Sequence, residues 1–276
     1  MCSSLKLVNL SISNIIWPKG EEFLGEFLSE LPKLGFRGVE LALNCFWEEP
    51  TTVSKAKLDW LNDLLKVNSL RVSALHSLTF TREDLELFGS EAKRAEMLDY
   101  LKKYIDLAVG LGCKDIVLGS PKARKKNGKK KEDCNQIFLE FLSEIDSYSP
   151  GVNISVEPLH PSSCEYLNYF TEVLSLLEKN NFENIKIQLD VRSFIENDEP
   201  SDLVEDFYSY ISHCQVSDPG LLIPSNQYSE THKKISDVLK RKKYDGFVAG
   251  EIINPMQIEK KEYLASAFKS LSLYYG

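Results

Sequence analysis

Histidine is scarce in this chain, and long apolar stretches are missing from it. Only 4 of the 276 residues are histidine, and no run approaches the roughly 18 apolar residues that a membrane span needs. The first residues, Met-Cys-Ser-Ser-Leu-Lys-Leu, also lack the apolar core of a signal peptide. We therefore expect a cytoplasmic protein that does not contact a membrane.

Paired cysteines and an excess of positive charge are missing too. The 6 cysteines form no CxxC motif, so we expect reduced thiols that pack as small apolar side chains. Lysine and arginine number 33 against 41 aspartates and glutamates, for a formal net charge of -8. Binding to a nucleic-acid backbone requires a dense positive surface, so nucleic acid is not an expected partner. Small molecules are expected instead, and a homo-oligomer is left open.

Eight short apolar runs recur along the chain, and enough residues for a helix follow each of them. The predicted strands are residues 5–12, 37–43, 70–76, 115–119, 152–157, 185–190, 210–216 and 246–252. The segments 97–108 and 138–145 have the i, i+3/i+4 apolar spacing of helices that pack one face on a sheet. Eight such units, in a chain near the ~250 residues typical of the fold, favour a (β/α)8 TIM barrel over an open doubly wound sheet. Because no linker interrupts the pattern, we expect one domain over residues 1–276.

A polar residue stands at the end of four of these predicted strands: Glu157, Asp190, Gln215 and Glu251. In a parallel barrel the carboxyl ends of the strands converge on one face, so these side chains would surround one small cavity. One such residue alone is as often a helix cap or half of a surface ion pair. Together, three carboxylates and an amide predict an oxygen-lined metal site.

Oxygen ligands favour hard divalent cations. We therefore expect one divalent ion, Mn²⁺ or Mg²⁺, with Co²⁺ and Zn²⁺ as alternatives. Such an ion can bind the carbonyl and the adjacent hydroxyl of a hydroxy-ketone or hydroxy-aldehyde and stabilise the enediolate formed when a carbon-bound proton leaves. Glu157 and Glu251, from nearly opposite strands, are the predicted proton-transfer residues.

Other polar side chains near predicted strand ends are candidates for substrate binding. His76 ends the third strand, and His213 shares one strand face with Gln215 by period-two spacing. His232 follows the seventh strand, and Glu40 lies in the second. We expect these groups to orient substrate hydroxyls or metal ligands.

Seven basic residues crowd the ten positions from 122 to 131. Most of this run is expected to form a solvated loop. Lys122 and Arg124 lie just beyond the fourth predicted strand, where we expect them to reach the cavity mouth. There they would hold an anionic group of the substrate, such as a phosphate, by charge-assisted hydrogen bonds.

Several short motifs follow one another in the order of the predicted strands. They are Gly38-Val-Glu-Leu41, Leu118-Gly-Ser-Pro-Lys122, Val156-Glu-Pro158, Leu189-Asp190, His213-Cys-Gln-Val-Ser-Asp218 and Tyr244-Asp-Gly246, which leads to Glu251. Together they resemble the xylose isomerase-like TIM barrels, the superfamily of sugar phosphate isomerases and epimerases. The resemblance spans nearly the whole chain.

The resemblance implies a metal-dependent isomerase or epimerase of a small sugar or sugar-like hydroxy-carbonyl compound. It implies Glu157, Asp190, Gln215 and Glu251 as the metal ligands and the two glutamates as the proton-transfer pair. Gln215 stands where many members carry histidine, in a form similar to that of hydroxypyruvate isomerase.

Two positions depart from the epimerases that bind free ketohexoses. Those enzymes usually have a histidine three residues after the metal-binding aspartate, where this chain has Ser193. They also have an arginine after the seventh strand, where this chain reads Pro219-Gly-Leu-Leu-Ile. Arg192 is a candidate substitute, although its neighbouring position predicts a side chain that points the other way.

Three alternative functions are weighed against an isomerase. A metal-dependent dehydratase of an inosose- or dehydroshikimate-like ketone would need the same ion and base on the same barrel. A sugar-binding barrel without catalysis would not need two glutamates at one metal. Type IV apurinic endonucleases share the resemblance, but their zinc site requires many more histidines than this chain contains.

Overall fold

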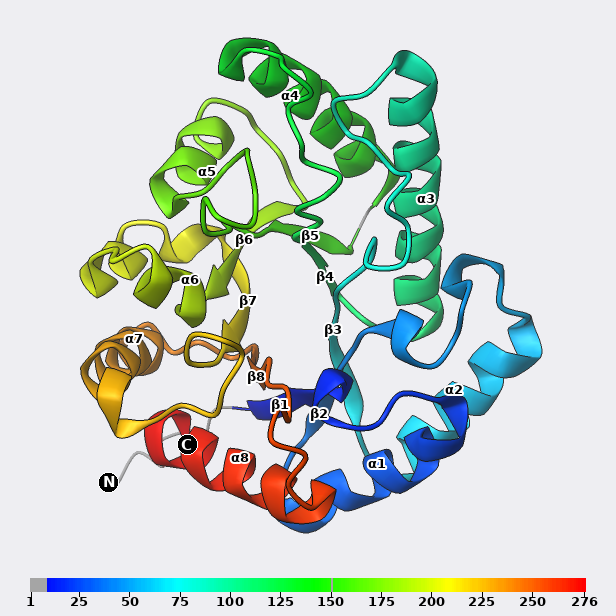
Figure 1. Ribbon diagram of the computed structural model, residues 1–276, viewed down its shortest axis with the longest axis vertical. Helices are drawn as coiled ribbons and strands as arrows, with labels where there is room; N and C mark the ends of the chain where they lie inside the picture. Colours follow the sequence, from blue (N-terminus) through cyan, green and yellow to red (C-terminus); the bar gives the residue numbers. More distant parts are fainter. Residues whose placement is uncertain (1–8, 150) are drawn as a thin grey trace.

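The computed structural model of the protein describes residues 9–149 and 151–276. Eight parallel strands pair in sequence order, and β1 also pairs with β8, so the sheet closes into a barrel (Figure 1). The strands are β1 (Asn9–Ser13), β2 (Gly38–Leu41), β3 (Arg71–Leu75), β4 (Asp115–Leu118), β5 (Asn153–Val156), β6 (Ile185–Asp190), β7 (Ile211–Val216) and β8 (Phe247–Gly250).

An α-helix follows every strand, and the helices form a ring outside the barrel (Figure 1). They are α1 (Glu21–Leu34), α2 (Lys55–Val67), α3 (Glu91–Gly110), α4 (Lys131–Tyr148), α5 (Phe170–Leu177), α6 (Val191–Glu196), α7 (Ser229–Arg241) and α8 (Lys260–Tyr275). The predicted (β/α)8 TIM barrel is therefore confirmed. Of the predicted first strand, residues 5–8 lie outside the described part of the chain.

The layer between the strands and the helices is apolar. Strand residues such as Ile12, Val39 and Val216 belong to one hydrophobic cluster with Leu28 of α1 and Tyr104 of α3. Successive side chains of a strand point to opposite faces of the sheet, so every second side chain faces the helices and builds this layer. Burial of these outward-facing apolar side chains stabilises the barrel. The residues that face the barrel interior are not part of this layer.

The interior of the barrel, in contrast, contains many buried polar side chains. Ser11, Glu40, Gln188, His213 and Gln215 all come from strands and are at most 1% exposed. Strand register aligns such residues across neighbouring strands: Gln188 pairs with His213, and Gln215 follows two residues later. The barrel interior thus contains many groups able to hydrogen-bond, and the candidate site described below lies at its carboxyl end.

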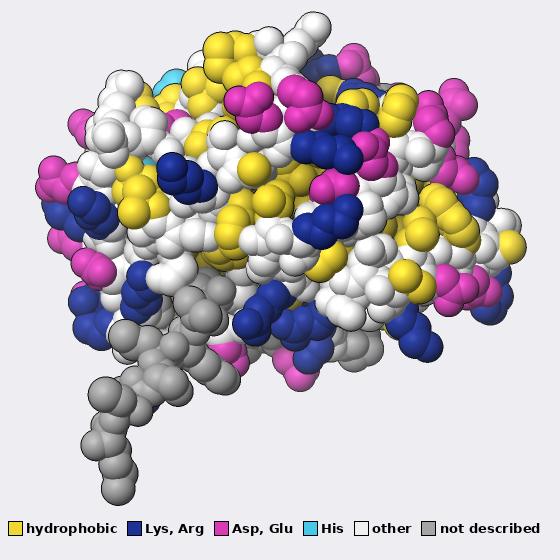
Figure 2. All heavy atoms as spheres, turned by 90° about the horizontal axis from the view of Figure 1, so that it is seen from below, with side chains coloured by type: hydrophobic (Ala, Val, Ile, Leu, Met, Phe, Trp, Pro, Cys, Tyr) yellow, Lys and Arg dark blue, Asp and Glu magenta, His cyan; other side chains and the backbone are white. Residues whose placement is uncertain are grey.

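The molecular surface carries charges of both signs. Basic and acidic side chains are interspersed on the face shown in Figure 2. Ion pairs such as Lys261 with Glu30, and Lys260 with Glu26, join α8 to α1. Among the described residues, no helix combines the length and the hydrophobicity that a membrane crossing requires.

Candidate functional site

A cavity of about 490 Å³ opens at the carboxyl ends of the strands, and residues that follow all eight strands line it. Its polar lining includes His76, Glu157, Arg192 and Glu251. Apolar side chains also line the cavity, from segments far apart in sequence: Ile15, Phe80, Leu159, Leu221 and Ile253. This is the end of a TIM barrel at which ligands bind.

Three carboxylates meet at this cavity. Glu157 directly follows β5, Asp190 ends β6, and Glu251 directly follows β8. One oxygen from each of these side chains lies within 4.8 Å of the other two. We call Glu157, Asp190 and Glu251 the triad. The structure therefore brings together three of the four side chains that the strand-end pattern indicated.

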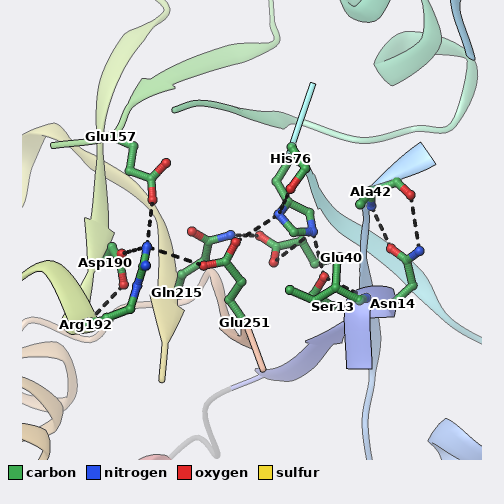
Figure 3. A network of polar contacts seen from close by, with 12 residues as sticks. Ser13, Asn14, Glu40, Ala42, His76, Glu157, Asp190, Arg192, Gln215 and Glu251 are labelled. Atoms are coloured by element: carbon green, nitrogen blue, oxygen red, sulfur yellow. Dashed lines mark hydrogen bonds and ion pairs between the residues drawn. The ribbon is translucent and has the colours of Figure 1, made fainter. Parts of the chain in front are cut away.

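Gln215, the fourth of these side chains, is fully buried in β7 and pairs in register with Asp190. Its Nε2 donates a hydrogen bond of 3.0 Å to Oε1 of Glu40. Its Oε1 finds no hydrogen-bond partner among the residues that the structure describes. In Figure 3 this oxygen lies on the side of the amide nearer Asp190 and Arg192, where it is available to a ligand of the triad.

Arg192 enters the triad, contrary to the direction expected from a strand. Its Nη2 lies 3.0 Å from Oδ2 of Asp190, 3.8 Å from Oε1 of Glu157 and 3.9 Å from Oε2 of Glu251 (Figure 3). The expectation was wrong because the chain becomes helical at Val191, and Asp190 is the N-cap of α6. Oδ1 of Asp190 accepts the Arg192 backbone N–H at 3.0 Å, which fixes the base of the arginine.

The environment shifts the pKa of the two glutamates in opposite directions. Burial raises the pKa of Glu157 to about 8, and the charges of Asp190 and Glu251 act in the same direction. Burial also acts to raise the pKa of Glu251, but a hydrogen bond with His76 and the charge of Arg192 outweigh it and lower that pKa. In the metal-free protein, these surroundings therefore favour the protonated form of Glu157 and the ionised form of Glu251.

The imidazole of His76 lies between Glu251 of the triad and the buried hydroxyl of Ser13. Its Nδ1 lies 3.2 Å from Oε1 of Glu251, and its Nε2 lies 2.6 Å from the Ser13 hydroxyl. Burial lowers the pKa of His76, but the charge of Glu40 and the hydrogen bond with Glu251 outweigh burial and raise it. His76 thus lines the cavity as expected and orients the Glu251 carboxylate.

Glu40 and His213 lie behind the cavity rather than on its surface. Both are at most 1% exposed, and neither belongs to the cavity lining. His213 Nε2 lies 2.7 Å from Oε1 of Glu40, the same oxygen that accepts the Gln215 amide. We call Glu40, His213 and Gln215 the Glu40 cluster. Glu40 accepts the Gln215 amide and lies 3.9 Å from Nε2 of His76, so it supports both side chains from behind the cavity. A ligand in the cavity does not reach Glu40 or His213 directly.

The two basic candidates after β4 have different positions. Lys122 lines the cavity and pairs with Glu83. Arg124 does not line the cavity: it is 1% exposed, and its Nη2 donates a hydrogen bond of 2.9 Å to the backbone carbonyl of Glu157. The loop turns Arg124 inward beneath the end of β5, so this residue supports the backbone at Glu157 and is too deep to hold a substrate anion.

His232 also lies away from the cavity. It belongs to α7, is fully buried, and has Nε2 at 2.8 Å from Oδ1 of Asp218 and Nδ1 at 2.8 Å from the Tyr275 hydroxyl. Both ring nitrogens are therefore engaged in fastening α7 to its neighbours. The sequence placed His232 after a strand, but helical packing directs its ring to α8.

Two further residues shape the triad and were not predicted. The Ser193 hydroxyl donates to Oδ2 of Asp190 at 3.0 Å, also lying 3.0 Å from the Pro158 carbonyl. Gly119 follows β4, and a Cβ at this position would lie 2.1 Å from Oε2 of Glu157. The motif around Gly119 was visible in the sequence, but only the structure shows that the Glu157 carboxylate fills the space of the missing side chain.

The donor set of the triad suits a hard divalent cation. Three carboxylates with oxygens within 4.8 Å of one another, together with the free Oε1 of Gln215, offer oxygen ligands only. The Arg192 guanidinium approaches the same three carboxylates. The residues therefore fit an ion, provided that the Arg192 side chain points elsewhere.

Known proteins share this fold at low sequence identity. A crystal structure of a D-psicose 3-epimerase in the presence of D-fructose has a TM-score of 0.79 and 16% identity, covering 97% of this chain and 99% of that one. A 3-keto-D-glucoside 4-epimerase from E. coli has a TM-score of 0.74 and 15% identity, covering 95% of this chain and 99% of that one. An AP endonuclease, family 2, from Brucella melitensis has a TM-score of 0.68 and 18% identity, covering 93% of this chain and 97% of that one. Such identities show the shared fold alone, and the activities differ.

Sequence comparison assigns the family. No curated protein matches the chain. The family model described as "Xylose isomerase-like TIM barrel" matches residues 28–271, which is most of the sequence. This match agrees with the closed barrel and with the carboxylates at its carboxyl end. The protein belongs to the xylose isomerase-like TIM barrel family.

Proposed function

We propose that this one-domain chain is an isomerase or epimerase of a small sugar-like hydroxy-carbonyl compound. One observation carries the proposal: Glu157 and Glu251, which follow β5 and β8, line one cavity and have carboxylate oxygens within 4.8 Å of each other. An acid and a base on either side of a substrate are what proton transfer between neighbouring carbons, or between two faces of one carbon, requires. Sugar epimerases among the structures of this fold support the choice of substrate class.

Glu251 is the proposed base. It is ionised, and His76 holds its carboxylate through the contact of 3.2 Å. In the proposed reaction Glu251 removes a proton from the carbon next to the substrate carbonyl. Ser13 fixes His76 from the other side at 2.6 Å, so the base has a defined orientation before the substrate binds.

Glu157 is the proposed acid. In the proposed reaction it returns a proton to the enediolate. Burial raises its pKa to about 8 only in the metal-free protein, since a carboxylate bound to a divalent ion is ionised. Glu157, Asp190, Gln215 and Glu251 would hold a divalent ion, for which Mn²⁺ or Mg²⁺ is the proposed choice. When bound, the ion supplies Lewis-acid polarisation of the substrate carbonyl. At the rim, Lys122 is the proposed partner of an anionic substituent, which would replace its ion pair with Glu83.

A dehydratase is the second candidate, and one observation favours it. A protonated Glu157 can donate to a departing β-hydroxyl as well as to a carbon. Elimination would use the same base, Glu251, and would release water instead of returning the proton. The product therefore separates the two functions, whereas the first proton abstraction does not.

Proton exchange in D₂O tests the proposal. The metal-stripped and the Mn²⁺-loaded protein are incubated with ketoses, ketose phosphates, hydroxypyruvate and inososes, and each compound is followed by NMR. We expect deuterium next to the carbonyl of at least one compound, and its loss in Glu251→Gln. An isomer as product supports an isomerase, and an unsaturated product supports a dehydratase. Absence of exchange throughout the panel, with or without metal, would contradict both.

A further inference from the structure

We propose that Arg192 is the resident cation of the triad and that a divalent ion binds only when its guanidinium leaves. The two cations then alternate at one position. The inference concerns the ion of the proposed function, but its test measures metal binding and the position of Arg192. It therefore stands or falls separately from the sugar chemistry.

Distances make the two cations mutually exclusive. Nη2 of Arg192 lies 3.0 to 3.9 Å from one oxygen of each triad member. Divalent ions lie about 2.0–2.6 Å from their oxygen ligands. An ion bound to all three carboxylates would therefore take the space that Nη2 occupies, and two positive charges at such a separation repel each other strongly.

The charges of the triad explain why a cation is needed there. Glu157, Asp190 and Glu251 are at most 12% exposed as side chains. Buried carboxylates without a compensating charge are costly. Arg192 compensates them in the structure, and a divalent ion would compensate them equally well. The triad thus has two ways to balance its charge, one supplied by the chain and one by a ligand.

Ion pairs with the triad hold the Arg192 guanidinium, and few hydrogen bonds add to them. Among the described residues, its side chain donates one hydrogen bond, from Nη2 to Oδ2 of Asp190, and its Nε has no partner. The side chain is 19% exposed and lines the 490 Å³ cavity. Rotation about its own torsions is sufficient to move the guanidinium into that space, because the backbone N–H is fastened separately to Asp190.

Mn²⁺ titration of the full-length, metal-stripped protein tests the proposal. Calorimetry, or the EPR signal of free Mn²⁺, gives the affinity of the wild type, Arg192→Gln and Arg192→Lys. Removal of the competing charge should tighten Mn²⁺ binding at least about tenfold in Arg192→Gln. Arg192→Lys, which keeps the charge, should stay closer to the wild type. Arg241→Gln removes an exposed arginine paired with Glu205 and should leave the affinity unchanged.

A second measurement needs no substitution at the site. Phenylglyoxal modification of wild-type Arg192, mapped by peptide mass spectrometry, should become faster in millimolar Mn²⁺. Arg192→Gln that binds Mn²⁺ no more tightly than the wild type would overturn the proposal, as would unchanged or slower modification of Arg192. Tighter binding without deuterium exchange would contradict only the proposed function, and exchange without tighter binding would contradict only this inference.

Discussion

Two groups of buried polar side chains lie close together in this barrel, and they are stabilised differently. In the Glu40 cluster, residues of β7 supply the nearest partners of Glu40, at 2.7 Å from His213 and 3.0 Å from Gln215. In the triad, the balancing charge is on Arg192, a long side chain at the start of a helix. The comparison teaches that fixed strand partners hold Glu40, whereas one side chain from a helix balances the charge of the triad.

Removal of the base should separate activity from stability most clearly. Glu251→Gln preserves the shape of the side chain, and we expect it to reduce deuterium exchange about 10²–10⁴-fold because the proton acceptor is lost. NMR exchange rates measure the loss, and urea unfolding should show a midpoint near that of the wild type. Glu26→Gln on the surface of α1 is the control, since it should leave the exchange rate unchanged. Full exchange activity in Glu251→Gln would remove this residue from the reaction.

Truncation in the Glu40 cluster should reduce stability, which Glu251→Gln should leave nearly unchanged. Glu40→Ala leaves His213 and the Gln215 amide buried without their acceptor. We expect the free energy of unfolding to fall by about 3 kcal/mol, the range for breaking a buried polar contact. Urea denaturation measures the change, and Lys55→Ala, at an exposed i,i+4 pair, should cause none. A Glu40→Ala protein as stable as the wild type would show that the two groups do not differ as described.

Gly119→Ala tests whether activity depends on the exact position of the Glu157 carboxylate. Its methyl group would meet Oε2 of Glu157 at 2.1 Å and displace the end of that side chain. A displacement of about 1 Å can cost roughly 10²-fold in rate, so we expect a loss of this order in deuterium exchange with nearly unchanged stability. Gly25→Ala in α1 is the matched control, because nothing lies within 4 Å of its Cβ position. Normal exchange by Gly119→Ala would mean that Glu157 acts from another position.

A pH dependence of stability is an expected effect that needs no substitution. Between its ordinary pKa of 4.5 and about 8, Glu157 is protonated in the folded protein but ionised in the unfolded chain. The folded state binds the extra proton, so the free energy of unfolding should decrease as pH rises, by up to about 1.4 kcal/mol per unit. Urea unfolding of metal-free protein between pH 5 and 8 measures the slope. Glu157→Gln should flatten it, and an equal slope in that variant would assign the effect to another group.

The sequence predicted the barrel well because repeated local patterns determine it. Runs such as 115–119 and 185–190 became β4 and β6 with little change in their bounds. The convergence of Glu157, Asp190 and Glu251 followed from topology, because a closed parallel barrel places all strand ends on one face. These inferences needed only the positions of residues along the strands.

Side-chain direction was beyond the reach of the same reasoning. Arg192 points into the triad because α6 begins immediately after β6, and periodicity does not locate such a junction within one residue. His232 and Arg124 have polar partners inside the protein, Asp218 and the Glu157 carbonyl, which sequence distance does not reveal. Strand geometry brought the three triad carboxylates together, whereas the residues that lie away from the cavity come from a loop and a helix whose orientation depends on packing.

The double role of Asp190 bears on the rate at which the site can change. Asp190 ends β6 and caps α6, so the backbone beneath Arg192 is anchored while the side chain is attached by its tip. Side-chain rotations occur in picoseconds to nanoseconds, whereas lids and hinges move in microseconds to milliseconds. The exchange of cations proposed above therefore needs the rotation of one side chain and no closing loop.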